Sequence, residues 1–149
     1  FEDGAGLRSR GVETAATKRL FNISKEEYEA RAAIVEGAYL YKGCAIATSD
    51  ELDPAMSVVL PMAANDLLTI NGVDASFVAV QVGTGVNISA RSLGAVNVQV
   101  IMESLGGGGH QTMAAAQLKH ITPEAARARI EGAIDKYYAS QKKGDVEGK

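Results

Sequence analysis

The sequence predicts an α/β domain in which a small mixed β-sheet is flanked by helices and preceded by a connecting helix. Two β-rich runs, residues 76–82 and 86–92, are separated by Gly83-Thr84-Gly85, a short glycine-containing connection typical of an antiparallel hairpin. Segments with helical periodicity lie on both sides of this pair. The 149 residues are enough for one domain with a core of its own.

The connecting helix is predicted from a capping box. Ser24 and Glu27 stand three residues apart, and apolar side chains follow at helical spacing, which predicts a helix from Ser24 to about Gly37. An earlier amphipathic pattern over residues 7–21 lacks a core of its own, so we expect it to be the end of another unit. We therefore assign residues 1–23 to that unit and residues 24–39 to the connecting helix.

The next segments predict a strand and then a helix. The small, mostly apolar stretch 41–49 is typical of a strand. Asp53-Pro54 opens a helical region that should end at the turn Asn71-Gly72. Within this region, Pro61 is expected to bend the helix or to mark where its regular part begins.

Two further helices are predicted after the hairpin. Asn97 is a suitable N-cap for a helix that ends at Gly106. Residues 113–121 are small and apolar and suggest a helical turn followed by a strand around residues 117–120, although the type of this segment stays open. Thr122-Pro123-Glu124 begins the last helix, and the polar residues 141–149 predict a flexible tail, so that residues 40–140 form the main domain.

Composition limits the function classes. Fifteen Lys and Arg against eighteen Asp and Glu give a formal charge of −3, which argues against broad binding to a nucleic-acid backbone. The chain has no tryptophan, so a wide base-stacking platform is not expected. Cys44 is the only cysteine, which excludes a disulfide framework. No apolar run approaches the roughly 18 residues of a membrane span, and the start at Phe1 suggests a piece of a longer protein.

A run of four glycines is the most informative motif. Gly106, Gly107, Gly108 and Gly109 precede His110, and ordering four glycines costs more backbone entropy than ordering any other four residues. The usual chemical reason for such a run is that backbone N–H groups come very close to an anion, typically a phosphate.

Other polar residues near this run can complete a phosphate site. In the strand 86–92, alternation places Asn87, Ser89 and Arg91 on one side and Val86, Ile88 and Ala90 on the other. The guanidinium of an arginine can bind two phosphate oxygens at once. Ser92 and Asn97 can supply neutral hydrogen-bond donors to the phosphate, and His110 can supply a further donor. The candidate substrate-binding residues are therefore Ser89, Arg91, Ser92, Asn97, Gly106, Gly107, Gly108, Gly109 and His110.

Plainer interpretations compete with this one. A strand face of Asn, Ser and Arg is most often exposed to solvent, and the glycines can form a long C-cap and loop. No lysine follows them, so they are not a Walker motif. His110 and His120 are the only histidines, and neither stands beside an aspartate, so no di-metal motif is visible. The residues alone predict a phosphate- or nucleotide-binding domain without catalytic machinery.

The same residues carry a resemblance to a known family. Ser89-Ala90-Arg91-Ser92-Leu93-Gly94, the run from Asn97 to Glu103, and Gly106 to His110 together resemble the DHHA1 domain of the DHH/DHHA1 phosphoesterases. Within that superfamily, the sequence of these segments, together with Leu67-Leu68-Thr69 and Ala75-Ser76-Phe77-Val78, is most similar to that of the membrane-anchored bacterial cyclic-di-AMP phosphodiesterases. The resemblance covers residues 24–138.

The resemblance implies that metal binding and substrate binding belong to two different subdomains. In that family a DHH subdomain holds two manganese ions, and the DHHA1 subdomain binds the substrate through an Arg-Ser pair and a Gly-Gly-Gly-His motif. In this sequence the resemblance places the pair at Arg91 and Ser92 and the motif at the residues from Gly107 to His110. The Asp-His-His motif is absent from this sequence, and residues 1–23 resemble the C-terminal end of a DHH subdomain. We therefore expect no catalytic residue, metal or cofactor in the chain itself.

The parent protein is then expected to be a manganese-dependent hydrolase that opens cyclic di-AMP to pApA, and the present piece to be inactive alone. The implied partners are cyclic di-AMP or pApA and the DHH subdomain, with no long nucleic acid and no direct membrane contact. A homodimer stays open. The implied location is a cytoplasmic domain of a membrane-anchored parent.

Two alternatives remain. One is the substrate domain of a nanoRNA or single-strand exonuclease of the same superfamily, and the other is a non-enzymatic nucleotide-binding or dimerisation module in which the glycines are purely structural.

Overall fold

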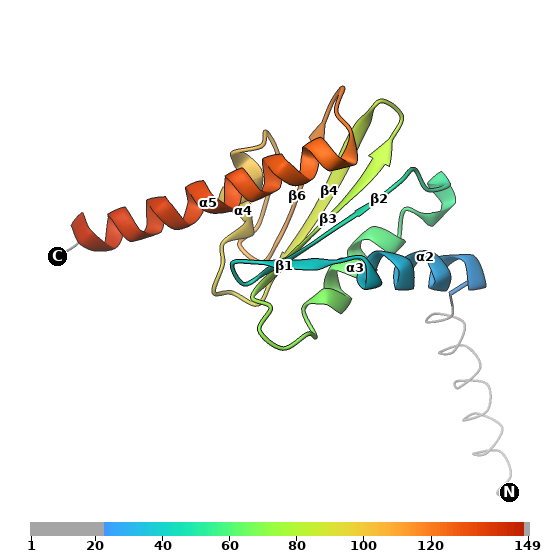
Figure 1. Cartoon of the computed structure of the whole chain (residues 1–149), viewed down its shortest axis with the longest axis horizontal. Coiled ribbons are helices and arrows are strands. Elements are labelled where there is room, and N and C mark those ends of the chain that lie inside the picture. Colours follow the sequence, from blue (N-terminus) through green and yellow to red (C-terminus); the bar gives the residue numbers. More distant parts are fainter. Residues whose placement is uncertain (1–22, 148–149) are drawn as a thin grey trace, which may run out of the picture.

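A six-stranded mixed β-sheet with helices on both faces forms the centre of the molecule (Figure 1). The computed structural model describes residues 23–147. The strand order is β1-β2-β3-β4-β6-β5, and every pair is antiparallel except β2–β3. The strands are β1 (Tyr39–Tyr41), β2 (Cys44–Ser49), β3 (Ala75–Val82), β4 (Gly85–Ser92), β5 (Gly108–Gly109) and β6 (Met113–Leu118). The predicted α/β class with a small mixed sheet is confirmed.

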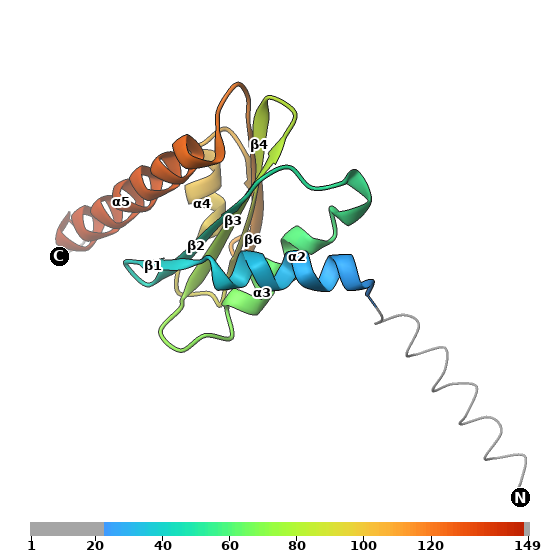
Figure 2. The same cartoon turned by 45° about the vertical axis from the view of Figure 1, so that its right-hand side comes forward.

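The helices form two layers (Figure 2). On one side of the sheet lie α2 (Lys25–Glu36) and α3 (Val59–Leu67), the latter preceded by the short 3₁₀ helix η1 (Pro54–Met56). On the other side lie α4 (Val98–Glu103) and the long α5 (Pro123–Glu147). Pro61 sits in the first turn of α3, where its missing N–H leaves no intrahelical hydrogen bond unmade.

Each helical layer has its own hydrophobic core. Phe77, Ile88 and Ile101 belong to the core beneath α4 and α5, and Val59, Leu67 and Val78 to the core beneath α2 and α3. Burying one such side chain contributes about 1.5–3 kcal/mol. The second core includes residues of β2 and β3 but none of β4 or β6, so half of this sheet face lacks a packed apolar layer.

Ion pairing and capping fix α2 to this body. The predicted capping box is confirmed, because Ser24 Oγ accepts a hydrogen bond from Glu27 N at 3.0 Å and Glu27 Oε1 accepts one from Ser24 N at 2.9 Å. Arg31 on α2 forms a bidentate ion pair with Asp66 on α3, with 2.7 Å between Nη2 and Oδ1. The helix predicted over residues 7–21 lies outside the described residues.

The predicted hairpin and the helix after it are also confirmed. β3 and β4 pair antiparallel around Gly83 and Thr84, and Asn97 caps α4 by accepting hydrogen bonds from Gln99 N and Val100 N. Gly106 follows α4 with φ of 88°, the left-handed conformation that favours glycine at a helix end.

The single strand predicted over residues 41–49 is wrong in one respect. The structure has a hairpin there, in which β1 and β2 are joined at Lys42 and Gly43. Both residues have positive φ, 51° and 80°, as a two-residue turn between twisted strands requires. Asp135 on α5 accepts hydrogen bonds from Tyr41 Oη at 2.8 Å and Lys42 Nζ at 2.5 Å, which anchors this hairpin.

The C-terminal part differs from expectation at two places. Residues 113–118 form β6 with no helical turn, because Ala114, Ala116 and Leu118 are buried in strict alternation with exposed neighbours. A flexible tail was predicted from residue 141, but α5 continues through Glu147. No proline interrupts this segment, and its Gln and Lys residues are good helix formers.

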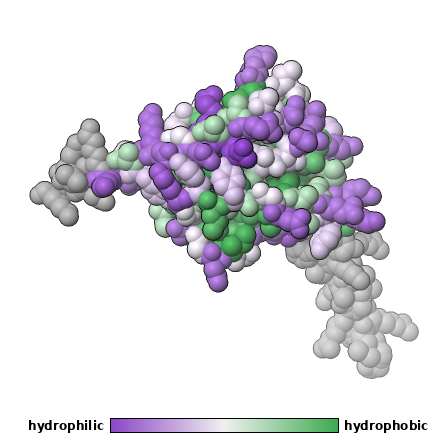
Figure 3. All heavy atoms as spheres, viewed as in Figure 1, coloured by the Kyte–Doolittle hydropathy of each residue, from purple (hydrophilic) through white to green (hydrophobic). Residues whose placement is uncertain are grey.

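The surface is mixed in character. The face in Figure 3 carries many hydrophilic side chains with smaller apolar areas between them. Leu40, Val58 and Ile70 are among the large apolar side chains that are exposed. Of the helices among residues 23–147, none combines the length and the hydropathy that crossing a bilayer requires.

The buried thiol of Cys44 gives a first prediction. Cys44 is fully buried, and burial raises its pKa to about 11. Because the thiolate is the reactive form, we expect the native protein at pH 8 to react with a disulfide reagent such as DTNB far more slowly than the unfolded protein. Stopped-flow absorbance with and without denaturant measures both rates. Equal rates in the two states would show that the thiol is accessible.

Candidate functional site

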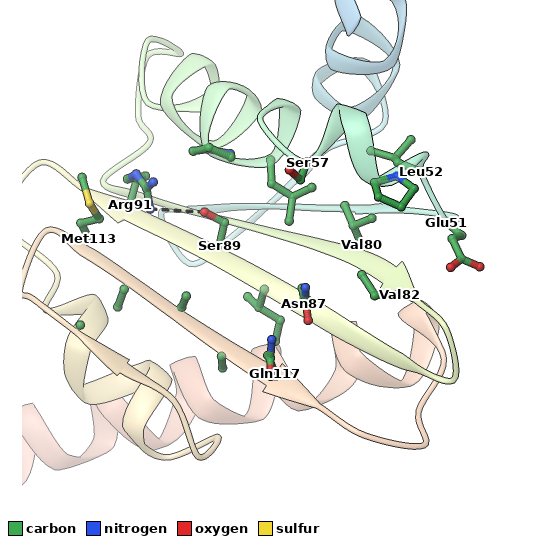
Figure 4. Close-up of a pocket in the computed structure, with 18 of the residues that line it drawn as sticks. Glu51, Leu52, Ser57, Val80, Val82, Asn87, Ser89, Arg91, Met113 and Gln117 are labelled. Atoms are coloured by element: carbon green, nitrogen blue, oxygen red, sulfur yellow. Dashed lines mark hydrogen bonds between the residues drawn. The ribbon is translucent and has the colours of Figure 1, made fainter. Parts of the chain in front are cut away.

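A groove of about 820 Å³ lies over the part of the sheet that the second core leaves open (Figure 4). Its floor comes from β3, β4 and β6, and its wall from η1, the start of α3 and the segment before them. Small-molecule sites commonly enclose about 300–1,000 Å³. The lining residues are Glu51, Leu52, Asp53, Pro54, Ser57, Leu60, Pro61, Val80, Val82, Asn87, Ile88, Ser89, Arg91, Gly109, His110, Met113, Ala114, Ala115, Ala116 and Gln117.

Strand alternation carries polar groups of β4 into this groove. Asn87, Ser89 and Arg91 line it, while Val86, Ile88 and Ala90 belong to the core beneath α4 and α5. The predicted separation of the two sides is therefore confirmed. The pairing of Ser89 with Val78 places its hydroxyl beside the edge of the second core, which explains why it is only 8% exposed.

Arg91 is the unusual charge in the groove. Its Nη1 donates to Ser89 Oγ at 3.3 Å and to Ala90 O at 2.8 Å, whereas its buried Nε has no hydrogen-bond partner. The ion pairs found among residues 23–147 do not include Arg91. Burial lowers the pKa of Arg91, but an arginine side chain stays charged. A half-buried cation without an acid partner is a favourable place for an anion.

The glycine run reaches the groove as an edge strand. Gly108 and Gly109 form β5 and pair with Ala115 and Ala114 of β6. A Cβ on Gly107 would lie 2.1 Å from Ala115 O, and a Cβ on Gly109 would lie 2.5 Å from Ala114 Cα. A Cβ on Gly108 would meet nothing within 4 Å. Gly107 and Gly109 are thus required by close packing on β6, and Gly108 faces open space.

Three amides of the segment from Gly106 to His110 are already occupied. Gly106 N donates to Glu103 O at 3.0 Å, Gly107 N donates to Met102 O at 2.8 Å, and His110 N donates to Met113 O at 2.6 Å. These hydrogen bonds continue the end of α4 and close the turn between β5 and β6. The sequence predicted that the glycine amides form a phosphate cradle, but the amides of Gly106 and Gly107 have a structural role instead.

His110 is a further lining residue of the groove. Its side chain is exposed, and its backbone N–H donates to the carbonyl of Met113, which lines the groove as well. The turn that carries it is held by Gln111, whose Nε2 donates to Gly94 O at 3.1 Å and whose carbonyl accepts from Val98 N at 3.0 Å. Of the predicted site residues, Ser89, Arg91, Gly109 and His110 line the groove, whereas Gly106, Gly107 and Gly108 do not.

Ser92 and Asn97 do not line the groove. Ser92 follows Arg91 by one residue and so points to the opposite side of β4, where its Oγ accepts a hydrogen bond from Gly94 N at 2.9 Å. Asn97 Oδ1 caps α4 by accepting from Gln99 N at 3.0 Å. In this structure both side chains accept hydrogen bonds from backbone N–H groups. The sequence had instead predicted that they contribute to a ligand site.

Several lining residues were not among the predicted candidates. Met113 and Gln117 come from β6, which the sequence left undecided, and Gln117 stands directly opposite Asn87 in the β4–β6 register. The sequence Met-Ala-Ala-Ala-Gln-Leu of residues 113–118 shows no clear alternation of apolar and polar residues, so the alternating burial of β6 becomes visible only in the structure. Leu52 and Ser57 enter from the segment before α3, and no local pattern marks them.

The residues that the structure describes do not fit a manganese pair. Across residues 23–147, no group of three or more His, Cys, Asp or Glu side chains is placed to hold a metal ion. We therefore derive no step through a metal from this part of the chain.

Fold and groove together define an α/β domain that presents an unpaired arginine in a groove of small-molecule size. The chain belongs to the DHHA1 domain family, whose pattern matches residues 42–139. It is 45% identical over 144 residues to the cyclic-di-AMP phosphodiesterase GdpP of Geobacillus thermodenitrificans, covering 95% of this chain and 22% of that protein. It is 40% identical over 143 residues to the cyclic-di-AMP phosphodiesterase PdeA of Listeria monocytogenes, again covering 95% and 22%. The chain thus spans about a fifth of the length of these relatives.

Solved structures share the fold. An exopolyphosphatase-related protein from Bacteroides fragilis superposes with a TM-score of 0.76 at 20% identity, covering 93% of this chain and 43% of that chain. RecJ from Thermus thermophilus, in complex with Mn²⁺, gives a TM-score of 0.53 at 17% identity over 74% of this chain and 17% of its own. At these identities the likeness establishes the architecture alone.

Proposed function

We propose that this domain is the substrate-binding part of a cyclic-di-AMP phosphodiesterase and that its groove binds a phosphate of cyclic di-AMP or pApA. The observation that carries the proposal is Arg91, a half-buried cation with an unpartnered Nε and no acid beside it among the described residues. Support also comes from the two relatives at 45% and 40% identity, which are named as cyclic-di-AMP phosphodiesterases.

In this proposal the chain binds and orients the nucleotide. The Arg91 guanidinium presents its free N–H groups to phosphate oxygens, and its hydrogen bond to Ser89 Oγ sets the plane of the fork. His110, whose exposed side chain also lines the groove, donates a further hydrogen bond to the phosphate.

The hydrolytic step is assigned elsewhere. We propose that a DHH subdomain in a longer, membrane-anchored protein holds the two manganese ions and faces this groove. No catalytic residue is proposed among residues 23–147.

The second prediction follows from this division. The 149-residue chain, supplied with Mn²⁺ and cyclic di-AMP, is expected to release no pApA above the background rate, because it holds no metal cluster in its described part. Anion-exchange chromatography of the reaction measures the product, and calorimetric titration with pApA measures binding in the same sample. Manganese-dependent turnover by the purified chain would contradict the assignment. Tighter binding of a short oligonucleotide than of pApA would favour an exonuclease domain instead.

A further inference from the structure

We infer that the end of the groove remote from Arg91 binds a purine base, and that Asn87 and Gln117 contact its N6/N7 edge and so favour adenine over guanine. This inference rests on the proposed function, because it takes the phosphate of the same nucleotide to lie at Arg91.

The spacing along β4 fits one nucleotide. Asn87 precedes Arg91 by four residues on the same side of the strand, which corresponds to about 13 Å between their Cα atoms. The Arg91 side chain leans toward Asn87, since its Nη1 reaches Ser89 between them (Figure 4). A phosphate, a ribose and a purine placed end to end span a comparable length.

Asn87 and Gln117 form a pair of side-chain amides at this end. They stand opposite each other in the β4–β6 register, and both line the groove. Figure 4 shows their amide ends near one another, and the one hydrogen bond drawn among the lining residues joins Arg91 and Ser89. Both amides are therefore available to a ligand.

The nearby carboxylates have structural partners. Glu51 Oε2 accepts a hydrogen bond from Gly83 N at 3.0 Å, and Asp53 Oδ1 accepts one from Ala55 N at 2.9 Å. Glu51 thereby fixes the β3–β4 turn, and Asp53 caps η1. The amides of Asn87 and Gln117 are left as the free polar groups at this end.

Charge orients the ligand along the groove. Arg91 supplies a positive charge at one end, and Glu51 supplies a negative charge at the other (Figure 4). Asp53, two residues after Glu51, also lines the groove. A phosphate is attracted to Arg91 and repelled by the carboxylates, so the neutral base is directed toward Asn87 and Gln117.

The walls suit the flat faces of a base. Leu52, Pro54, Val80 and Val82 line this end, and no aromatic side chain is among the lining residues. The base is held by aliphatic contact on its faces and by hydrogen bonds at its edge, the usual arrangement of a small-molecule site. Without aromatic stacking, the affinity depends strongly on the edge contacts.

The amide chemistry favours adenine at the N6/N7 edge. A carboxamide offers one donor group and one acceptor, and adenine presents the N6 donor beside the N7 acceptor. Guanine presents two acceptors, O6 and N7, at the same edge, so the carboxamide oxygen is left facing an acceptor.

The test is a nuclear magnetic resonance titration of the ¹⁵N-labelled 149-residue chain with AMP, GMP, 7-deaza-AMP and ribose 5-phosphate. We expect AMP to bind about fivefold or more tightly than GMP, at the lower end of what one bidentate base contact gives. The side-chain amide signals of Asn87 and Gln117 should shift with AMP. 7-Deaza-AMP, which lacks the N7 acceptor, should bind about as weakly as GMP.

Amide variants test whether the contact with the N6/N7 edge of the base, and not a change in the fold, determines the preference for AMP. Asn87→Leu and Gln117→Met keep the approximate side-chain size but remove both the donor and the acceptor of the amide, and each should reduce the AMP-to-GMP ratio to within about twofold. Gln99→Leu removes a carboxamide outside the groove and should leave the ratio unchanged.

The outcomes distinguish the two proposals. If ribose 5-phosphate shifts the signals of Arg91 while AMP and GMP bind equally, the base site is overturned and the phosphate site stands. An AMP-to-GMP ratio that survives in both amide variants also overturns the base site. If neither ribose 5-phosphate nor any nucleotide shifts the Arg91 signals, the proposed function fails with it.

Discussion

Replacement of Arg91 by methionine is expected to weaken the binding of pApA by about tenfold or more, because a hydrogen bond to a charged group contributes about 1.5–3 kcal/mol. The same change should leave the melting temperature unchanged or higher. In the free protein the guanidinium is partly desolvated, its Nε has no partner, and burial lowers its pKa, so removing it relieves a cost of folding. Calorimetric titration and thermal unfolding measure the two effects.

Matched variants show whether charge or geometry matters. Arg91→Lys keeps the charge but loses the planar fork, and we expect intermediate affinity. Arg129→Met removes an exposed arginine of α5 that lies outside the groove and should change neither property. Wild-type affinity in Arg91→Met would rule out the proposed phosphate site, and a large fall in melting temperature would mean that Arg91 is primarily structural.

Alanine at Gly107 or Gly109 is expected to give the largest loss of stability among single changes in the glycine run. At each position the added Cβ would collide with the backbone of β6, at 2.1 Å from Ala115 O and at 2.5 Å from Ala114 Cα. Gly109 also has φ of 147°, which L residues rarely adopt. Because backbone cannot move aside as a flexible side chain does, we expect the free energy of unfolding to fall by about 3 kcal/mol or more.

Gly108→Ala is the matched control in the same strand. Its Cβ would enter open space, so the free energy of unfolding should change by less than about 1 kcal/mol. Chemical denaturation of the three variants measures the differences. Similar stability in all three would contradict the close packing of β5 on β6.

The elements with strong local signals were predictable. The capping box at Ser24, the glycine turn after Val82 and the N-cap at Asn97 each fix backbone through neighbours in sequence, and all three appear as expected. The separation of Arg91 and Ser89 from the core face of β4 followed from the same kind of rule, because alternation is local.

Features that depend on distant partners were missed. Ala114, Ala115 and Ala116 have weak strand propensity, and β6 exists because it pairs with β4 and β5. The glycine run looked like a phosphate loop until its contact with β6 was visible. Ser92 was grouped with Arg91 although one residue along a strand reverses the side-chain direction.

The most direct measurement compares AMP with adenosine on the wild-type chain and on Arg91→Met. Adenosine lacks the phosphate, so the pair of ligands isolates its contribution, and the pair of proteins isolates that of Arg91. We expect the wild-type chain to bind AMP about tenfold or more tightly than adenosine, and Arg91→Met to bind the two ligands with nearly equal affinity. An undiminished preference for AMP in Arg91→Met would contradict the proposed phosphate site at Arg91.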